Sequence, residues 1–171
     1  MKISSRKIVV TGMLAAIAII LGATGFGMIP IPGPAGRATI MHVPAILGGI
    51  LEGPVVGAFV GLLFGLYSFL NPTSLSADPL VSVFPRIFIG IFSYLVYNAL
   101  KRHKTVGPAV AAIVGTLTNT IGFLGMAVLR GYLNWQAVVA IIITNTIGEV
   151  IVAVIIVVIL VRALTRHKLQ N

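Results

Sequence analysis

Six long apolar stretches, separated by turns and short charged segments, dominate this sequence of 171 residues. They cover about 6–24, 38–51, 54–70, 80–100, 106–128 and 137–164. Only 9% of the residues are charged, whereas an ordinary soluble domain carries roughly a quarter. A soluble fold would therefore lack the polar surface needed to cover so much apolar chain. We predict an all-α polytopic membrane protein with six transmembrane helices, built as one domain over residues 1–171.

Prolines and glycines mark the boundaries of these stretches. Three prolines within residues 30–34 exclude helix interior, so we predict an ordered loop at 25–36. The second stretch is short, since its 14 residues rise about 21 Å, less than the ~30 Å hydrocarbon core. In the third stretch glycines recur every fourth residue, at Gly53, Gly57, Gly61 and Gly65. This spacing predicts one small-residue face on which another helix can pack closely.

Basic residues gather at alternate turns of the predicted chain path. The sequence has 12 Lys and Arg against 3 Asp and Glu, and most of the basic residues lie near the N-terminus, at 101–104 and near the C-terminus. The positive-inside rule then predicts that both termini lie inside. Because topology accounts for the positive charge, we expect no nucleic-acid partner. A basic start before an apolar stretch also resembles a signal peptide, but more membrane segments follow it, so we expect a retained first helix.

Few residues suit catalysis, metal binding or nucleotide binding. The sequence has no cysteine and no carboxylate pair, and its histidines, at 42, 103 and 167, are far apart. It also has no Gly-Lys pair, so the common phosphate-binding loop is absent. We therefore expect no bound metal, no cofactor and no enzymatic activity.

Polar residues inside the apolar stretches are the main candidates for a binding site. The pentapeptide Thr-Asn-Thr-Ile-Gly occurs twice, at 118–122 and 144–148. Helical geometry places Asn119 about 14 Å and Asn145 about 12 Å from the outer ends of neighbouring helices. Glu149 lies one turn deeper than Asn145 on the same face, and Arg86 lies near the outer end of the fourth helix. Together these residues predict an outward-facing polar pocket.

Each candidate also has a purely structural interpretation. The asparagines could form hydrogen bonds between helices, and Glu149 could be a purely structural partner of an arginine or a backbone group. The side chain of Arg86 could extend to the lipid headgroups. His42 suits a structural role at least as well as a ligand contact. Trp135 suits an anchor at the membrane interface, or an aromatic ring stacked on a flat ligand.

The order and spacing of several segments resemble the substrate-binding S components of energy-coupling factor (ECF) vitamin transporters, over nearly the whole chain. The segments are Thr-Gly-Met-Leu-Ala-Ala-Ile-Ala at 11–18, Ile-Met-His-Val-Pro at 40–44, Gly-Ile-Leu-Glu-Gly-Pro at 49–54, Asp-Pro-Leu-Val-Ser-Val-Phe-Pro-Arg-Ile-Phe-Ile-Gly at 78–90 and Asn-Thr-Ile-Gly-Glu-Val-Ile-Val-Ala-Val at 145–154. The resemblance implies a plasma-membrane protein that captures a water-soluble vitamin from outside. It implies a complex with a transmembrane coupling subunit and two ATPase subunits.

The resemblance also implies where the vitamin and the coupling subunit bind. The family's site is built by the first loop and helices four to six, which here carry Arg86, Asn119, Asn145 and Glu149, with 28–37 as a lid. Further site candidates are Arg37, His42 and Trp135. Small residues of the first helix meet the coupling subunit in this family, often as Ala-x-x-x-Ala. The nearest matches here are Gly12-x-x-x-Ala16 and Ala18-x-x-x-Gly22, and we expect Gly12, Ala15 and Ala16 to form the docking face.

The identity of the vitamin stays open at the level of sequence. Arg86 suits a carboxylate and slightly favours pantothenate. Glu149 suits an amine or hydroxyl-rich group, as in pyridoxine-type vitamins or thiamine precursors, and cobalamin, folate and riboflavin also remain. The rival classes are a self-sufficient carrier or channel for a small polar solute, and a membrane scaffold or enzyme. The sequence has no obvious inverted repeat, and this absence argues against a carrier.

Overall fold

The computed structural model describes residues 4–30, 37–71 and 77–167 and shows a helical bundle. The elements are α1 (Ser5–Thr24), β1 (Met28–Pro30), β2 (Arg37–Thr39), α2 (Val43–Glu52), α3 (Pro54–Leu70), α4 (Pro79–Ser82), α5 (Phe84–Leu100), α6 (Val106–Leu129), α7 (Trp135–Ile141), a π-helical turn η1 (Ile142–Thr146) and α8 (Ile147–His167). The short α4 leads into α5, and α7, η1 and α8 follow one another without a break. The described chain therefore forms six helical segments, and the predicted all-α membrane fold is confirmed.

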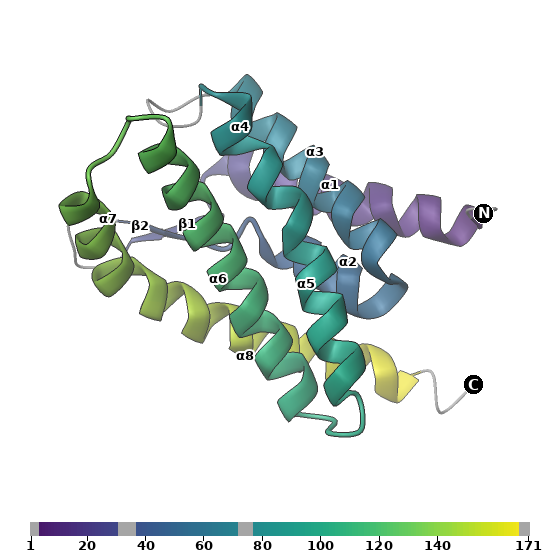
Figure 1. Ribbon diagram of the computed structural model, residues 1–171. Coiled ribbons are helices and arrows are strands. Elements are labelled where there is room, and N and C mark those ends of the chain that lie inside the picture. Colours follow the sequence, from purple (N-terminus) through teal and green to yellow (C-terminus); the bar gives the residue numbers. More distant parts are fainter. Residues whose placement is uncertain (1–3, 31–36, 72–76, 168–171) are drawn as a thin grey trace.

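The six segments run back and forth between two ends of the bundle (Figure 1). The N-terminal end, the α2–α3 turn, the α5–α6 loop and the C-terminal end lie at one end. The two strands and the α3–α4 and α6–α7 connections lie at the other. The first end carries the basic residues of 101–104, so the positive-inside rule predicts that it faces the cytoplasm. We call it the inner end and the opposite one the outer end.

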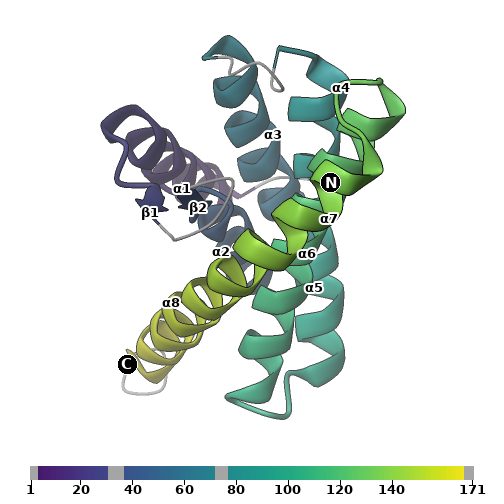
Figure 2. The same cartoon turned by 90° about the vertical axis from the view of Figure 1, so that its left-hand side faces the viewer.

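Four of the segments are long and apolar enough to cross a membrane: Ser5–Thr24, Pro79–Leu100, Val106–Leu129 and Trp135–Thr165. Helix α2 has 10 residues and rises only about 15 Å. It contacts α1, α3, α5, α6 and α8, and Figure 2 shows it near the middle of the bundle. Because protein rather than lipid surrounds it, this helix has no need to match the thickness of the hydrocarbon core.

Several boundaries differ from the predicted ones. The predicted second helix began at 38, whereas β2 occupies Arg37–Thr39 and pairs antiparallel with β1, Met28 lying opposite Thr39. Residues 31–36 of the predicted loop lie outside the described residues. The predicted fourth helix is interrupted at Val83, because Pro85 lacks the N–H that a continuous helix requires. The last segment begins at Trp135, where the side chain of Asn134 caps α7 by accepting from the Ala137 N–H at 2.8 Å.

Glycines of α3 allow its backbone to touch the backbones of α2 and α5. A Cβ atom built on Gly57 would lie 2.7 Å from the Gly90 Cα atom and 2.8 Å from the Gly49 Cα atom. One turn further along α3, a Cβ atom on Gly61 would collide with the Arg86 carbonyl group. The predicted small-residue face is thus a packing surface, except that Gly53 forms the α2–α3 turn with φ 103°.

An ion pair joins the connections at the outer end. Asp78 caps α4 by accepting from the Leu80 N–H at 2.9 Å, and its second oxygen accepts from Arg130 Nε at 2.6 Å and from the Tyr132 hydroxyl at 3.3 Å. The hydrogen bond from Arg130 lowers the pKa of Asp78 below its ordinary value of 3.8. This carboxylate therefore fixes the start of α4 to the end of α6.

Replacing Gly57 or Gly90 with alanine is expected to destabilise the protein, because the new methyl group forces the α3 and α5 backbones apart. Overpacking of this kind typically costs about 1–3 kcal/mol. The matched control is Gly125→Ala, since a Cβ atom at Gly125 meets nothing within 4 Å. Thermal unfolding in detergent compares the three variants with the wild type. Equal melting temperatures for Gly57→Ala and Gly125→Ala would contradict the close contact.

The negative charge of Asp78 is expected to stabilise the protein at neutral pH and to lose this effect in strong acid. A folded-state pKa below 3.8 means that the stabilisation is complete at neutral pH and is lost as the pH falls below the ordinary value. Asp78→Asn keeps the helix cap but removes the charge. Its melting temperature should therefore be lower at pH 7 and approach that of the wild type near pH 3. A constant difference between the two proteins across this range would contradict the ion pair's role.

Candidate functional site

A cluster of buried polar side chains lies between β2, α2, α5, α6 and the η1–α8 segment. Its members are His42, Arg86, Thr116, Asn119, Thr120, Asn145, Thr146 and Glu149, each at most 7% exposed. We call this set the polar cluster. Polar groups at membrane depth are costly unless they have partners, so each of them requires an explanation.

Glu149, on α8, joins three parts of the chain. One carboxylate oxygen accepts from the Thr39 backbone N–H at 2.9 Å, and the other accepts from the Thr120 hydroxyl at 3.0 Å. The first bond fixes β2 against α8, and the second fixes α6 against α8. The Glu149 carboxylate therefore lies on the side of the polar cluster that faces β2.

His42 precedes α2 and is fully buried. Its Nε2 atom lies 2.9 Å from the Thr116 hydroxyl of α6. Thr116 is one turn away from Asn119 and Thr120 on the same helix, so the imidazole continues the row of polar side chains along α6.

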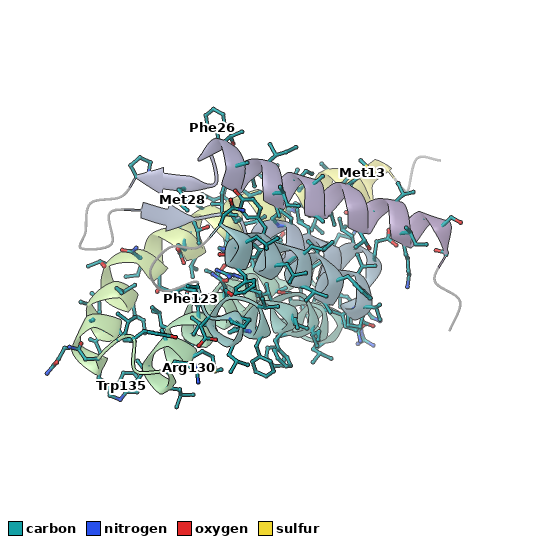
Figure 3. All side chains as sticks on the ribbon, turned by 90° about the horizontal axis from the view of Figure 1, so that it is seen from above. Met13, Phe26, Met28, Phe123, Arg130 and Trp135 are labelled. Atoms are coloured by element: carbon teal, nitrogen blue, oxygen red, sulfur yellow. The ribbon has the colours of Figure 1, made fainter. Side chains whose placement is uncertain are left out.

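Arg86 extends from the first turn of α5 between two aromatic rings. Its guanidinium carbon lies 4.4 Å from the ring centroid of Phe64 on α3 and 5.3 Å from that of Phe123 on α6. Its Nη1 atom donates to the Ser82 carbonyl group. Phe123 lies within the bundle, inward of Arg130 and Trp135 (Figure 3). The rings and the carbonyl hold the guanidinium group in one place, and cation–π contacts supply part of its stabilisation.

Arg86 has no carboxylate partner among the described residues. The sequence contains three acidic residues. Glu52 pairs with Arg6 at 2.7 Å, Asp78 pairs with Arg130, and Glu149 accepts from Thr39 and Thr120. A buried guanidinium group without a counter-ion is energetically costly, and this cost points to an anionic ligand.

Unsatisfied hydrogen-bonding atoms concentrate in the polar cluster. Among the described residues, four buried side-chain atoms have no hydrogen-bond partner: His42 Nδ1, Arg86 Nε, Asn119 Oδ1 and Thr146 Oγ1. They come from four different elements and all belong to the cluster. Buried polar atoms are satisfied in most proteins, so a group of orphaned atoms in one place is typical of a ligand site.

The repeated pentapeptide contributes to the cluster in both copies. Asn119 and Thr120 of the first copy are buried, as are Asn145 and Thr146 of the second. The first threonine of each copy bonds back to its own helix, Thr118 to Val114 O at 2.7 Å and Thr144 to Ala140 O at 2.8 Å. The two copies thus present equivalent side chains from α6 and η1.

The structure brings together five of the seven side chains predicted for the site: His42, Arg86, Asn119, Asn145 and Glu149. Trp135 lies elsewhere, because it is 68% exposed at the first turn of α7, at the outer end (Figure 3). The backbone of Arg37 begins β2, but its side chain lies outside the described part of the structure.

The predicted docking face of α1 is exposed in part. Gly12 and Ala16 are exposed, and nothing lies within 4 Å of a Cβ atom built on Gly12. Ala15 is 4% exposed, so the prediction that it remains on the surface is wrong. The reason is helical geometry, since Ala15 shares the buried face of α1 with Ala18.

Sequence reasoning missed several residues of the site. Thr120 and Thr146 could have been found, because each follows an asparagine in the repeated pentapeptide. The backbone of Thr39 carried no signal, since its role depends on the strand pairing of β1 and β2. Phe64 and Phe123 are indistinguishable in sequence from other phenylalanines of the membrane segments.

Two apolar grooves lie outside the polar cluster. One, of about 380 Å³, lies between α5 and α6 on the side of Phe84, Phe88 and Ile121. The other, of about 420 Å³, lies at the inner end between Val10 and Met13 of α1 and Leu164 of α8. The first is lined almost entirely by apolar residues, and the second is mostly apolar but includes the Arg6–Glu52 pair.

Comparison with known proteins shows a family match over most of the chain. Residues 6–161 match the family model of the substrate-specific component of ECF transporters. A pantothenic acid transporter, PanT, of Lactococcus lactis subsp. cremoris is 34% identical in an alignment that covers 77% of this chain and 80% of the relative.

Solved structures have the same fold. The structure of ThiT from Listeria monocytogenes superposes with a TM-score of 0.68 at 22% identity, over 92% of this chain and 93% of the other. A structure described as the S component of a bacterial ECF transporter superposes with a TM-score of 0.64 at 28% identity, over 95% and 96%. The chain therefore belongs to the family of substrate-specific components of ECF transporters.

Proposed function

We propose that this chain binds a water-soluble vitamin in the polar cluster, as the substrate-binding subunit of an ECF-type importer in the plasma membrane. The observation that carries the proposal is the buried guanidinium group of Arg86, which has no carboxylate partner among the described residues. A bound carboxylate would supply the missing counter-charge and a hydrogen-bond acceptor for Arg86 Nε.

Pantothenate is the vitamin that these groups favour. It has a carboxylate at one end, hydroxyl groups at the other and a secondary amide between them. Phe123 of α6 contacts the Arg86 guanidinium group, and Thr120, one turn earlier on the same helix, donates to the Glu149 carboxylate. The positive and the negative group therefore follow one another along α6. A ligand with an anion at one end and hydroxyl donors at the other matches this order of charges. A cationic vitamin would be repelled by Arg86. The 34% identity to PanT points the same way.

The importer requires partner subunits. The sequence has no Gly-Lys pair and hence no common phosphate-binding loop, so nucleotide hydrolysis must be supplied by other chains. We propose a transmembrane coupling subunit and two ATPases. The exposed face of α1 around Gly12 and Ala16 suits the coupling subunit, because small residues let another helix approach closely.

Replacing Arg86 with glutamine is expected to weaken pantothenate binding strongly. Removing one member of a buried charge pair costs about 2–5 kcal/mol, or roughly thirtyfold or more in Kd. The matched control is Arg102→Gln, because Arg102 is exposed in the α5–α6 loop. Isothermal titration of the purified subunit with pantothenate and with its neutral alcohol analogue measures the effect. The wild type should prefer the acid, and Arg86→Gln should not; an unchanged preference would refute the assignment.

Replacing Ala16 with tryptophan is expected to block assembly with the coupling subunit while leaving vitamin binding intact, because its bulk prevents close helix approach. The matched control is Leu95→Trp, which adds the same ring to an exposed position on α5. Copurification with the coupling subunit measures assembly, and titration of the isolated chain measures binding. Normal assembly of Ala16→Trp would contradict the docking face, and continued transport without assembly would indicate a self-sufficient carrier.

A further inference from the structure

The backbone break before α5 leaves a carbonyl group for the Arg86 side chain. Pro85 has no N–H, and the helix is interrupted at Val83, between α4 and α5. The Arg86 N–H donates to the Val83 carbonyl group at 3.1 Å, whereas in a continuous α-helix it would donate to the Ser82 carbonyl group, four residues back. The Ser82 carbonyl group accepts from Arg86 Nη1 instead. The direction of the guanidinium group therefore depends on the position of the last residue of α4.

Two kinds of contact hold this guanidinium group. Its carbon atom lies 4.4 Å from the ring centroid of Phe64 and 5.3 Å from that of Phe123. A cation–π contact depends mainly on the distance between the cation and the ring, so it restricts the rotation of the N–H groups little. The hydrogen bond to the Ser82 carbonyl group is directional. It therefore decides which N–H groups, Arg86 Nε among them, point toward a ligand.

Helix α4 is too short to fix its own position. It has four residues, and an isolated helix of this length has no stability of its own. Asp78, which precedes it, accepts from the Leu80 N–H through its carboxylate at 2.9 Å. The Asp78 carbonyl group accepts from the N–H and from the hydroxyl of Ser82, each at 2.9 Å. Asp78 thus holds both the start and the end of α4.

Asp78 is in turn fixed by residues that follow α6. Its carboxylate accepts from Arg130 Nε at 2.6 Å and from the Tyr132 hydroxyl at 3.3 Å. The side chain of Asp78 is only 6% exposed, and charge-assisted hydrogen bonds are stronger than neutral ones. The contacts form a continuous path from Arg130 through Asp78 and α4 to the guanidinium group of Arg86.

We propose, on the basis of the proposed vitamin-binding function, that Asp78 and Arg130 are positioning residues for Arg86. The ion pair fixes α4, and the Ser82 carbonyl group at the end of α4 directs the guanidinium group toward the carboxylate of the ligand. A guanidinium group binds a carboxylate best when its planar set of N–H groups faces the two oxygens. Without the ion pair α4 shifts, and the site keeps its positive charge but loses much of its preference for a carboxylate.

The experiment breaks the ion pair from either side. Pantothenate and its neutral alcohol analogue are titrated into the wild type, Asp78→Asn and Arg130→Gln, below the melting transition of every variant. Pantothenate should bind both variants about threefold to thirtyfold more weakly. The affinity for the alcohol should not change, because the alcohol does not require an oriented guanidinium group. An unchanged preference for the acid in either variant, or equal losses for the two ligands, would overturn the positioning role.

The opposite charges of the two side chains distinguish positioning from long-range electrostatics. Arg130→Gln removes a positive charge and Asp78→Asn removes a negative one, so their direct effects on an anionic ligand have opposite signs. Positioning predicts a loss in both variants, and tighter binding of pantothenate by Asp78→Asn would overturn it. The double variant should lose no more than the weaker-binding single variant, because both substitutions break one interaction. Losses that multiply would also overturn the proposal.

Arg6→Gln is the matched control. It breaks the ion pair with Glu52, of 2.7 Å, at the inner end of the bundle. The side chains of Arg6 and Arg130 are similarly exposed, at 60% and 49%. Arg6→Gln should keep the wild-type preference for the acid. A loss equal to that of Arg130→Gln would show that breaking either ion pair has the same effect, and would overturn the proposal.

Arg86→Gln separates this inference from the proposed function. If the wild type does not prefer the acid, or if Arg86→Gln keeps the preference, the assignment of the ligand's carboxylate to Arg86 fails and this inference fails with it. If Arg86→Gln loses the preference while Asp78→Asn and Arg130→Gln keep it, the proposed function stands and the positioning role is overturned.

Discussion

The backbone contact between α3 and α5 sets the position of Arg86, on which the proposed binding site depends. Gly57 touches Gly90, and Gly61 touches the carbonyl group of Arg86, so the two helices meet without side chains between them. Any larger residue at these positions would move the start of α5. The guanidinium group of Arg86 also packs on Phe64, which belongs to the same helix as the glycines. Helix α3 therefore fixes both the backbone and the charged end of Arg86.

The polar cluster shows how a membrane protein keeps costly groups in place. Glu149 is satisfied by two donors from β2 and α6, and His42 contacts Thr116. Arg86 is held by rings and one carbonyl group. The fold thus supplies partners for some of the polar atoms of these side chains and holds their other polar atoms in fixed directions. In such an environment a ligand with matching groups gains more than it would in water, because hydrogen bonds are stronger where the local dielectric constant is low.

Much of the fold followed from the sequence, because long apolar stretches and basic turns are physical requirements of a membrane. The polar residues within those stretches also indicated most of the cluster. The prediction was wrong where tertiary contacts decide the backbone. Strand β2 exists through pairing with β1, and its Thr39 N–H reaches Glu149 only in the folded chain. The burial of Ala15 and the exposure of Trp135 likewise depend on which helix face meets a neighbour.

The repeated pentapeptide shows that identical sequence does not imply identical chemistry. Its two copies share every residue, and both bury their asparagine and second threonine. In the regular helix α6, the second threonine donates to Glu149 and the asparagine oxygen is left without a partner among the described residues. In η1, the Thr144 hydroxyl lies within reach of both Ala140 O and Asn145 Oδ1, and it is Thr146 Oγ1 that lacks a partner among the described residues. The same five residues therefore form different hydrogen bonds in a regular α-helix and in a π-helical turn.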